Sequence, residues 1–448
     1  MVHTFSLLGQ QIATDTNSGA VHILDPISFD ILSRTTGPLE GDLPFTDLPY
    51  HSAELEEAWE ELKELQAQGL LYSSDQYLDT EKAMELPASA PIKALCLHIA
   101  HDCNLRCSYC FAATGDFGTG RKVMTTETAK KAIDFVVERS VNRHNIEIDF
   151  FGGEPLMAMD VVREAVDYAR SLEKKHDKCF RFTITTNGVL LDDDTIEYIN
   201  REMSNVVLSL DGREEVNDAM RKTVNGKGSY QTILPKFQKL TKSRDNSLDY
   251  YVRGTFTRQN LDFAEDVIHL AEVGFTQVSV EPASGDAADP FAIKEEDLPA
   301  VFAEYERLAH QLLEKEDLNF FHFNVDLEQG PCVIKRVRGC GAGCEYVAIT
   351  PDGEIFPCHQ FVGKEDYLMG NLEDNTFDMD KSRKFSALNI FSREDCAQCW
   401  AKFYCSGGCS ASNLIVNGNL QKSNFVACEM ERKRLECAIA MKAVQATR

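Results

Sequence analysis

The stretch Cys103-Asn104-Leu105-Arg106-Cys107-Ser108-Tyr109-Cys110 says more about this chain than any other segment. Its three cysteines have the spacing CxxxCxxC. Thiolates bind soft metals, and such short spacers can wrap three thiolates around one face of a [4Fe–4S] cube. An electron-transfer cluster uses four cysteines, so the fourth iron here would stay open to bind a substrate or cofactor. A zinc site is the alternative for closely spaced cysteines.

The composition indicates a soluble globular protein and argues against membrane and nucleic-acid partners. The chain has 448 residues, 43% hydrophobic and 26% charged, which is typical of a soluble globular protein with two or three domains. No apolar run could span a membrane, and the N-terminal MVHTFSLLGQQIATD lacks the features of a signal peptide. We therefore expect a cytoplasmic protein without a membrane partner, and its 15 cysteines indicate metal ligation rather than disulfides. The net charge of −25 argues against a nucleic-acid partner.

Residues 1–86 are predicted to form a separate small domain. Short alternating stretches at Thr4–Leu8, Gln11–Thr14 and Val21–Leu24 indicate a β-hairpin or small sheet. Helices are expected at Phe29–Leu32 and Ala53–Gln68, the second because apolar residues recur there at three- and four-residue steps. Residues 87–91 (PASAP) are typical of a linker.

Residues 92–320 alternate between predicted strands and helices. The strands are expected at 93–100, 146–151, 180–186, 205–210, 249–256 and 276–281, and the helices at 126–142, 160–175, 193–202, 230–243, 261–273 and 296–315. Six βα units predict an α/β fold with a parallel sheet and helices outside it. Sites on such sheets lie at the carboxyl ends of the strands, where Cys103, Gly152, Asn187, Asp211 and Glu281 fall.

A second motif, Gly152-Gly153-Glu154-Pro155, follows the strand that ends at Phe151. Together with the cysteine motif and its Tyr109, it resembles the radical S-adenosylmethionine (SAM) superfamily. The resemblance implies a partial (β/α)6 barrel and a [4Fe–4S] cluster held by Cys103, Cys107 and Cys110, whose open iron binds SAM.

The resemblance also implies further SAM contacts. Tyr109 lies beside the cofactor, and the segment Gly152, Gly153 and Glu154 binds its amino group. Thr186 and Asn187, in the motif TTNG, lie near SAM. Ser209 and Asp211, in SLDG, reach its ribose and amino-acid ends. Arg221 pairs with its carboxylate, a role that suits a guanidinium.

Residues 325–448 are rich in cysteine. The spacing Cys396-x2-Cys399-x5-Cys405-x3-Cys409 resembles the SPASM domain, as does Gly353 five residues before Cys358. The resemblance implies two auxiliary [4Fe–4S] clusters, which makes three clusters in all. One would be held by Cys340, Cys344, Cys358 and Cys409, and the other by Cys396, Cys399, Cys405 and Cys428. Zinc is the alternative metal, and a free Cys340 or Cys344 would leave an open auxiliary iron.

The remaining cysteines are interpreted as structural. Cys96 and Cys179 lie on or near predicted strands, Cys437 lies in a helix predicted at Met430–Val444, and Cys332 is a loop thiol. His101 and His359 stand beside ligand cysteines, where a structural or ligand-supporting role is expected.

Two longer resemblances suggest a reaction. A hairpin followed by helices resembles the winged-helix RiPP recognition element, which binds the leader of a ribosomally made, modified peptide. The runs Arg338–Tyr346 (RGCGAGCEY) and Cys358–Phe361 (CHQF) resemble the SCIFF maturases, or ranthipeptide synthases. These resemblances imply that the chain forms intramolecular thioethers, from Cys sulfur to carbon, in a Cys-rich precursor peptide. The implied partners are that peptide with its leader and a reductant such as flavodoxin or ferredoxin.

Two alternatives stay open. One is another SPASM enzyme, such as an anaerobic sulfatase maturase. The other, from a different class, is a non-catalytic Fe–S or zinc protein that binds peptides or carries electrons. SAM cleavage under reducing conditions would separate this last class from both enzymes.

Overall fold

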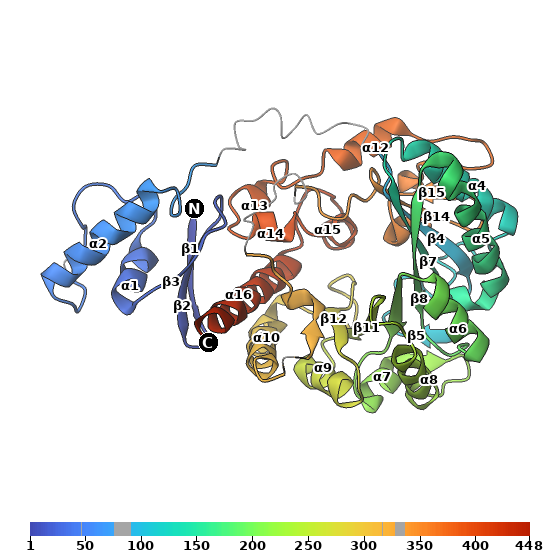
Figure 1. Cartoon of the computed structure of the whole chain (residues 1–448), viewed down its shortest axis with the longest axis horizontal. Coiled ribbons are helices and arrows are strands. Elements are labelled where there is room, and N and C mark those ends of the chain that lie inside the picture. Colours follow the sequence, from blue (N-terminus) through green and yellow to red (C-terminus); the bar gives the residue numbers. More distant parts are fainter. Residues whose placement is uncertain (46, 76–90, 316, 328–336) are drawn as a thin grey trace.

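The computed structural model describes residues 1–45, 47–75, 91–315, 317–327 and 337–448. Most of the expected linker at 87–91 lies outside these ranges, as do the end of the expected N-terminal domain and Cys332. Figure 1 shows three regions in chain order: a small N-terminal unit, a curved sheet covered by helices, and a C-terminal region that lies between them and along one edge of the sheet.

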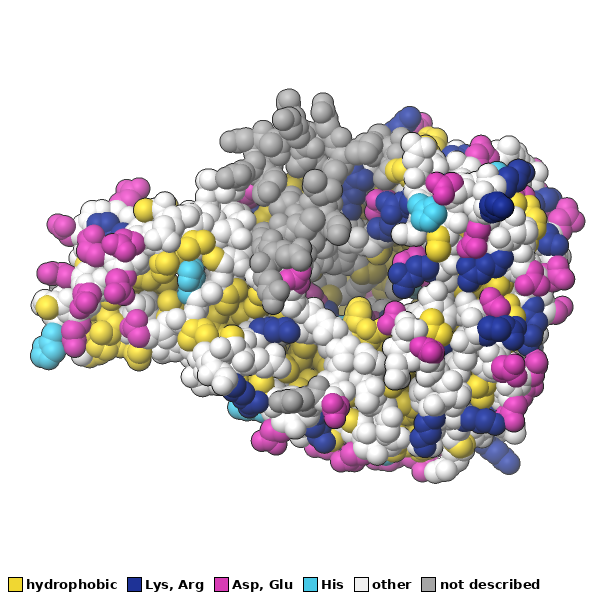
Figure 2. Space-filling model, in the orientation of Figure 1, with side chains coloured by type: hydrophobic (Ala, Val, Ile, Leu, Met, Phe, Trp, Pro, Cys, Tyr) yellow, Lys and Arg dark blue, Asp and Glu magenta, His cyan; other side chains and the backbone are white. Residues whose placement is uncertain are grey.

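The N-terminal unit consists of a three-stranded antiparallel sheet and two helices. The elements are β1 (Val2–Leu7), β2 (Gln10–Asp15), β3 (Val21–Ile23), α1 (Pro26–Arg34) and α2 (Ser52–Ala67). Asp25 caps α1 by accepting hydrogen bonds from the amides of Ile27 and Ser28. One face of the sheet and the two helices enclose a local core that includes Ile31, Trp59 and Leu62. Acidic side chains gather over α2 at the outer end of this unit (Figure 2).

The central region is a parallel sheet with helices on its outer face. Its main strands are β4 (Ala94–His101), β7 (Asn145–Gly152), β8 (Cys179–Thr186), β9 (Asn205–Ser209), β11 (Asp249–Phe256), β12 (Gln277–Pro282) and β13 (Asn319–Phe320). The helices between them are α4 (Thr126–Arg139), α5 (Met159–His176), α6 (Asp193–Glu202), α7 (Glu214–Met220), α8 (Tyr230–Lys242), α9 (Phe263–Glu272) and α10 (Leu298–Leu312). All six expected strands and all six expected helices of this region are therefore confirmed.

The sheet runs in the order β13-β12-β11-β9-β8-β7-β4, and neighbouring strands are parallel. Every residue of β4 is buried, which is expected of a parallel strand covered on both faces. The longer helices turn an apolar face inward; in α5 this face comprises Val161, Val162, Ala165, Val166 and Ala169. Figure 1 shows the helices along the convex side of the curved sheet.

The C-terminal region extends the same sheet. The strands β14 (Tyr346–Ile349), β15 (Glu354–Phe356) and β16 (Gly370–Asn371) add to its other edge, with β14 parallel to β4. The helices are α12 (Met379–Ser386), α13 (Glu394–Ala397), α14 (Lys402–Cys405), α15 (Ser410–Asn417) and α16 (Phe425–Thr447). The last helix begins five residues before its expected start, because the Asn424 side chain caps it by accepting from the Ala427 amide.

The long helix α16 lies between the N-terminal sheet and the barrel (Figure 1). Phe5, Leu7 and Ile12 on the second face of the N-terminal sheet join the main core together with Trp400 and Leu435. The His3 ring stacks on Trp400 with a centroid separation of 4.1 Å and bonds Glu436 at 2.9 Å. The N-terminal unit is thus packed against the cysteine-rich region. Within the described residues, each helix is too short or too polar to cross a lipid bilayer.

Candidate functional site

A cavity of about 250 Å³ opens at the carboxyl ends of the barrel strands. It brings together eleven of the residues predicted from sequence: Cys103, Cys107, Tyr109, Cys110, Gly152, Gly153, Glu154, Thr186, Asn187, Ser209 and Arg221. These residues come from the loop after β4 and from the ends of β7, β8 and β9, and from β10 (Arg221–Thr223). The parallel arrangement of the strands explains why motifs more than one hundred residues apart meet here.

The three cysteines lie in a loop that closes back on the barrel. Cys107 ends the short strand β5 (Leu105–Cys107), which pairs with β10. Cys103 Sγ faces two donors, the Leu105 amide at 3.4 Å and the Asn187 amide group at 3.5 Å. Burial raises the pKa of Cys103 and of Cys107 to about 11. The metal-free thiols are therefore protonated near neutral pH, and iron binding must displace their protons.

Close backbone contacts fix the glycine motif against this loop. A Cβ on Gly153 would overlap the Asp102 carbonyl, and one on Gly152 would overlap the Ala100 carbonyl. Gly152 also has a φ of 123°, which disfavours any other residue. Gly152 therefore packs directly on the end of β4 and Gly153 on the start of the cysteine loop, where a larger residue would separate the two motifs.

Glu154 is the buried acid of the glycine motif. Its carboxylate accepts hydrogen bonds from the Leu156 amide at 3.0 Å, the Thr186 hydroxyl at 2.8 Å and the Asn187 amide at 2.8 Å. Burial raises the pKa of Glu154 to about 7, although these donors act in the opposite direction. Glu154 thereby ties the end of β7 to the end of β8 and holds Thr186 and Asn187 in place.

Asp211 is the one predicted SAM residue that does not line the cavity, because its carboxylate is fully buried. It accepts instead from the Tyr109 hydroxyl at 2.6 Å and the Thr255 amide at 3.1 Å. Burial raises the pKa of Asp211 to about 6, while Arg221 and the Tyr109 hydrogen bond lower it. Asp211 supports the cavity wall from behind.

Arg221 forms part of that wall. Its Nη1 donates to the Tyr109 oxygen at 2.8 Å and lies 3.8 Å from Asp211. Its Nε is buried and has no hydrogen-bond partner among the described residues. A buried guanidinium with a free donor at a cavity suits a carboxylate ligand. The amino-acid end of SAM carries such a carboxylate. The free donor of Arg221, the close glycine contacts and the three thiols therefore fit a cluster with bound SAM.

The cavity also contains residues that the motifs did not indicate. Arg253 and Thr255 lie at the end of β11, and Phe111 follows the last motif cysteine. Only their position at a strand end or beside Cys110 could have suggested them. Burial raises the pKa of Glu281, but Arg253, His322 and Arg434 outweigh it and hold the pKa below its usual value. Glu281 is therefore an ionised group at the cavity.

The C-terminal cysteines line two further cavities. Cys340, Cys344, Cys358 and Cys409 surround one of about 40 Å³, with Arg338 and Arg393 beside them. Cys396, Cys399, Cys405 and Cys428 surround another of about 370 Å³, with Lys402 and Arg432 beside them. The structure thus brings together the same two sets of four thiols that the resemblance to the SPASM domain implies.

Among the described residues, no group of three His, Cys, Asp or Glu side chains is placed to hold a single metal ion. A zinc ion would draw its thiolates onto one centre, whereas a cluster ligates them to separate iron atoms. Four thiols around one cavity supply the donor set of a [4Fe–4S] cluster and equally that of a four-coordinate zinc site.

The other cysteines and histidines named in the sequence analysis are structural, except for His359. Cys96 and Cys437 are buried in the core, as expected, and Cys179 lies half-buried in β8. His101 is also structural, bonded to His98 at 3.0 Å and to Thr119 at 2.8 Å. His359 differs, because it lines the cofactor cavity beside Phe111 and Phe151.

Comparison with known proteins agrees with this geometry. Residues 97–285 match the radical SAM superfamily, and residues 340–400 match the SPASM iron–sulfur cluster-binding domain. A cysteine-type anaerobic sulfatase-maturating enzyme of Clostridium novyi is 24% identical over 329 residues, covering 69% of this chain and 85% of that enzyme.

Two solved structures share the fold. The enzyme anSMEcpe with bound SAM and the Kp18Cys peptide has a TM-score of 0.65 at 18% identity, covering 80% of this chain and 100% of that one. SuiB of Streptococcus suis bound to SAM has a TM-score of 0.55 at 18% identity, covering 95% of this chain and 98% of that one. The chain therefore contains a radical SAM domain followed by a SPASM iron–sulfur domain, and it has the α/β fold of radical SAM enzymes.

Proposed function

We propose that the chain forms intramolecular thioethers in a ribosomally made, Cys-rich precursor peptide. Each cross-link joins a cysteine sulfur to a carbon atom of the same peptide and removes two hydrogen atoms. The proposal includes three [4Fe–4S] clusters, SAM, and an electron donor of the flavodoxin or ferredoxin type. Cys103, Cys107 and Cys110 would hold the SAM-binding cluster, and the two sets of four thiols would hold the others.

Each cofactor group has residues suited to it. When bound, the cluster and SAM supply one-electron chemistry that removes hydrogen from an unactivated carbon. The protein supplies orientation and exclusion of water: a hydrogen bond joins Asn187 to Glu154, another joins Arg221 to Tyr109, and all four residues line the cavity. The substrate is then proposed to contact Arg253, Glu281 and His359, which line the same cavity.

The observation that carries the thioether proposal is the adjacency of two cavities. Cys358 lines the first C-terminal cavity, and the next residue, His359, lines the cofactor cavity. Cys340 and Cys409 in the same set are exposed. An iron site one residue away from the hydrogen-abstraction cavity suits a reaction that must bring a peptide sulfur to a carbon, because iron ligation lowers a thiol pKa and orients the sulfur.

The N-terminal unit is proposed to bind the leader of the precursor. β3 is at one edge of its sheet, and the Ile23 side chain there is 44% exposed. An unpaired sheet edge can add an extended peptide as a further strand. SuiB, whose fold matches over 95% of the chain, offers a structural counterpart that includes this unit.

The sulfatase-maturase alternative has support from the relatives named above. The two functions differ in the fate of the sulfur. A thioether retains the cysteine sulfur in the peptide and blocks it, whereas oxidation of cysteine to formylglycine removes the sulfur and leaves an aldehyde.

Mass spectrometry separates these outcomes. Anaerobic reactions would contain reconstituted protein, SAM, reductant and a Cys-rich peptide encoded beside the gene. We expect a loss of two hydrogens per cross-link and thiols that no longer alkylate. Loss of sulfur with a hydrazine-reactive aldehyde would contradict the thioether proposal and support the alternative. The control is Cys179→Ala, since this thiol lines none of the three cavities; it should react like the wild type.

A further inference from the structure

We propose that Asp266 and Arg213 are a positioning pair that sets the geometry of the SAM pocket through Asp211. Neither residue touches the cavity. The proposal requires SAM binding but not thioether formation, so it can be tested independently of the proposed reaction.

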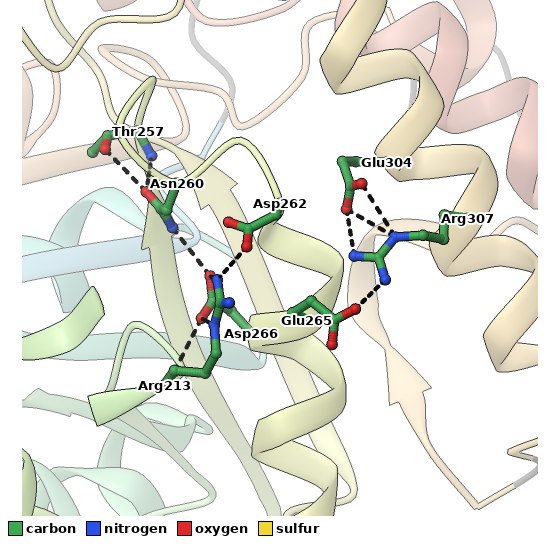
Figure 3. Close-up of polar contacts among 8 residues, drawn as sticks. All are labelled: Arg213, Thr257, Asn260, Asp262, Glu265, Asp266, Glu304 and Arg307. Carbon is green, nitrogen blue, oxygen red and sulfur yellow. Dashed lines mark hydrogen bonds and ion pairs between the residues drawn. The ribbon is translucent and has the colours of Figure 1, made fainter. Parts of the chain in front are cut away.

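The pair joins a buried carboxylate to a half-buried guanidinium at the turn after β9 (Figure 3). Asp266, on α9, is fully buried. Its Oδ1 accepts from the Arg213 backbone amide at 3.0 Å and from Arg213 Nε at 2.8 Å. Arg213 Nη2 also lies 2.9 Å from Asp262. One carboxylate thus holds both the main chain and the side chain of the residue two positions after Asp211.

A second contact of Asp266 reaches the next strand. The Asn260 side chain donates to Asp266 Oδ2 at 3.1 Å and accepts from the Thr257 amide at 2.8 Å (Figure 3). Thr257 directly follows β11. Asp266 therefore connects the turns after two neighbouring strands, β9 and β11, on the side away from the cavity.

The intervening Gly212 shows how closely the two parts fit. Its φ is 133°, and a Cβ there would overlap the Asp266 side chain. The turn can pack directly on the carboxylate because no side chain separates them. A shift of Asp266 would consequently move the turn that carries Asp211.

Asp211 links the β9 turn to residues that line the pocket. Its carboxylate accepts from the Tyr109 hydroxyl and from the Thr255 amide, and Tyr109 in turn bonds Arg221. Tyr109, Thr255 and Arg221 all line the cavity. At metal sites, mutation of a residue that orients a ligand from behind typically costs about tenfold or more in affinity, and Asp211 stands in the same relation to the residues of this pocket.

The test compares SAM affinity and thermal stability in reconstituted protein. Asp266→Asn keeps the shape and an acceptor oxygen but removes the charge that holds Arg213. We expect its Kd for SAM to rise about tenfold. Two controls isolate this effect. Glu265→Gln changes the neighbouring residue of α9, which pairs with Arg307 outside this network (Figure 3). Asp297→Asn breaks another ion pair between a buried carboxylate and a half-buried guanidinium, with Arg258 at 3.0 Å, which does not contact the β9 turn.

The controls should leave the Kd for SAM within twofold of the wild type, even where Asp297→Asn lowers Tm as much as Asp266→Asn does. The proposal is overturned if Asp266→Asn lowers Tm yet leaves the Kd unchanged, because its role would then be purely structural. It is also overturned if Asp211→Asn leaves the Kd unchanged, because the pair acts through Asp211. Peptide products, measured separately by mass spectrometry, report on the proposed reaction and do not enter this comparison.

Discussion

The Tyr109 hydroxyl donates a 2.6 Å hydrogen bond to the Asp211 carboxylate, across 102 positions of sequence. One residue belongs to the cysteine loop and the other to the turn after β9. Arg221 joins them by donating to the Tyr109 oxygen at 2.8 Å. Burial raises the pKa of Tyr109 well above its usual value, so the phenol stays protonated and able to donate. This three-residue contact fixes the position of the cysteine loop relative to the barrel.

Replacing Tyr109 with Phe should weaken SAM binding. The change removes the donor to Asp211 and the acceptor of Arg221, and leaves two buried charged groups with fewer partners. We expect a three- to tenfold higher Kd for SAM, or about 1 kcal/mol, with iron content unchanged. Equilibrium binding to reconstituted protein measures this. Tyr198→Phe, on α6 outside the cavity, is the control; equal Kd values in both variants would refute the role of Tyr109.

A methyl group at Gly153 should disrupt the site. Gly153→Ala would place its Cβ onto the Asp102 carbonyl, next to Cys103, where only backbone movement could relieve the overlap. Reconstituted protein should therefore bind SAM at least tenfold more weakly. Gly37→Ala is the matched control, because nothing lies within 4 Å of its added Cβ. Normal SAM binding by Gly153→Ala would show that the two motifs do not need this contact.

The free energy of unfolding should depend on pH because of the buried Asp149 carboxyl. Burial, together with nearby Glu147, raises the pKa of this β7 carboxyl to about 7. Between its usual pKa and 7 the folded chain binds more protons than the unfolded chain, so the free energy of unfolding falls as pH rises. Asp149→Asn removes this cost. Its advantage in Tm over the wild type should already be present at pH 5, grow until about pH 7 and stay constant above it.

Thermal unfolding between pH 5 and 8.5 tests this directly. The upper limit of the gain is about 1.4 kcal/mol for each pH unit crossed. Asp160→Asn, at the exposed start of α5, is the control and should follow the wild type at every pH. A difference between Asp149→Asn and the wild type that does not change with pH would contradict the assignment.

His3 should hold the N-terminal unit against the C-terminal region. His3→Ala removes the ring stacked on Trp400 and the contact with Glu436. Hydrogen exchange at the amides of β1 should quicken severalfold, while the amides of β7 and β8 stay protected. His144→Ala, an exposed residue of the barrel, is the control. Unchanged exchange in β1 would mean that the apolar contacts of Phe5 and Ile12 suffice for docking.

The sequence predicted the barrel well because its strands are short apolar stretches separated by amphipathic helices. The expected strand at 93–100 is β4 (Ala94–His101), and that at 180–186 is β8 (Cys179–Thr186). The parallel pairing of β14 with β4 was not predicted, since Tyr346–Ile349 lies some 250 residues away and no local pattern encodes a partner strand.

The sequence predicted the site residues that belong to motifs. It missed the residues that only the folding of the chain brings to the cavity. Cys103 and Glu154 were identified from their motifs. Arg253 was not, because an arginine near the end of a strand resembles any exposed residue. Asp211 was expected beside SAM from the resemblance, whereas its buried carboxylate bonds Tyr109 and lies 3.8 Å from Arg221, two residues that do line the cavity. Only the three-dimensional order of the side chains distinguishes a wall residue from its support.

Formation of 5′-deoxyadenosine by wild-type and Cys103→Ala protein tests the central claim most directly. Both proteins would be reconstituted and assayed anaerobically with SAM and reductant, and their iron content measured. The account predicts cleavage by the wild type, none above background by Cys103→Ala, and iron retained by the variant at its eight C-terminal thiols. Cleavage by Cys103→Ala at the wild-type rate, or a wild-type protein that contains zinc and cleaves no SAM, would contradict it.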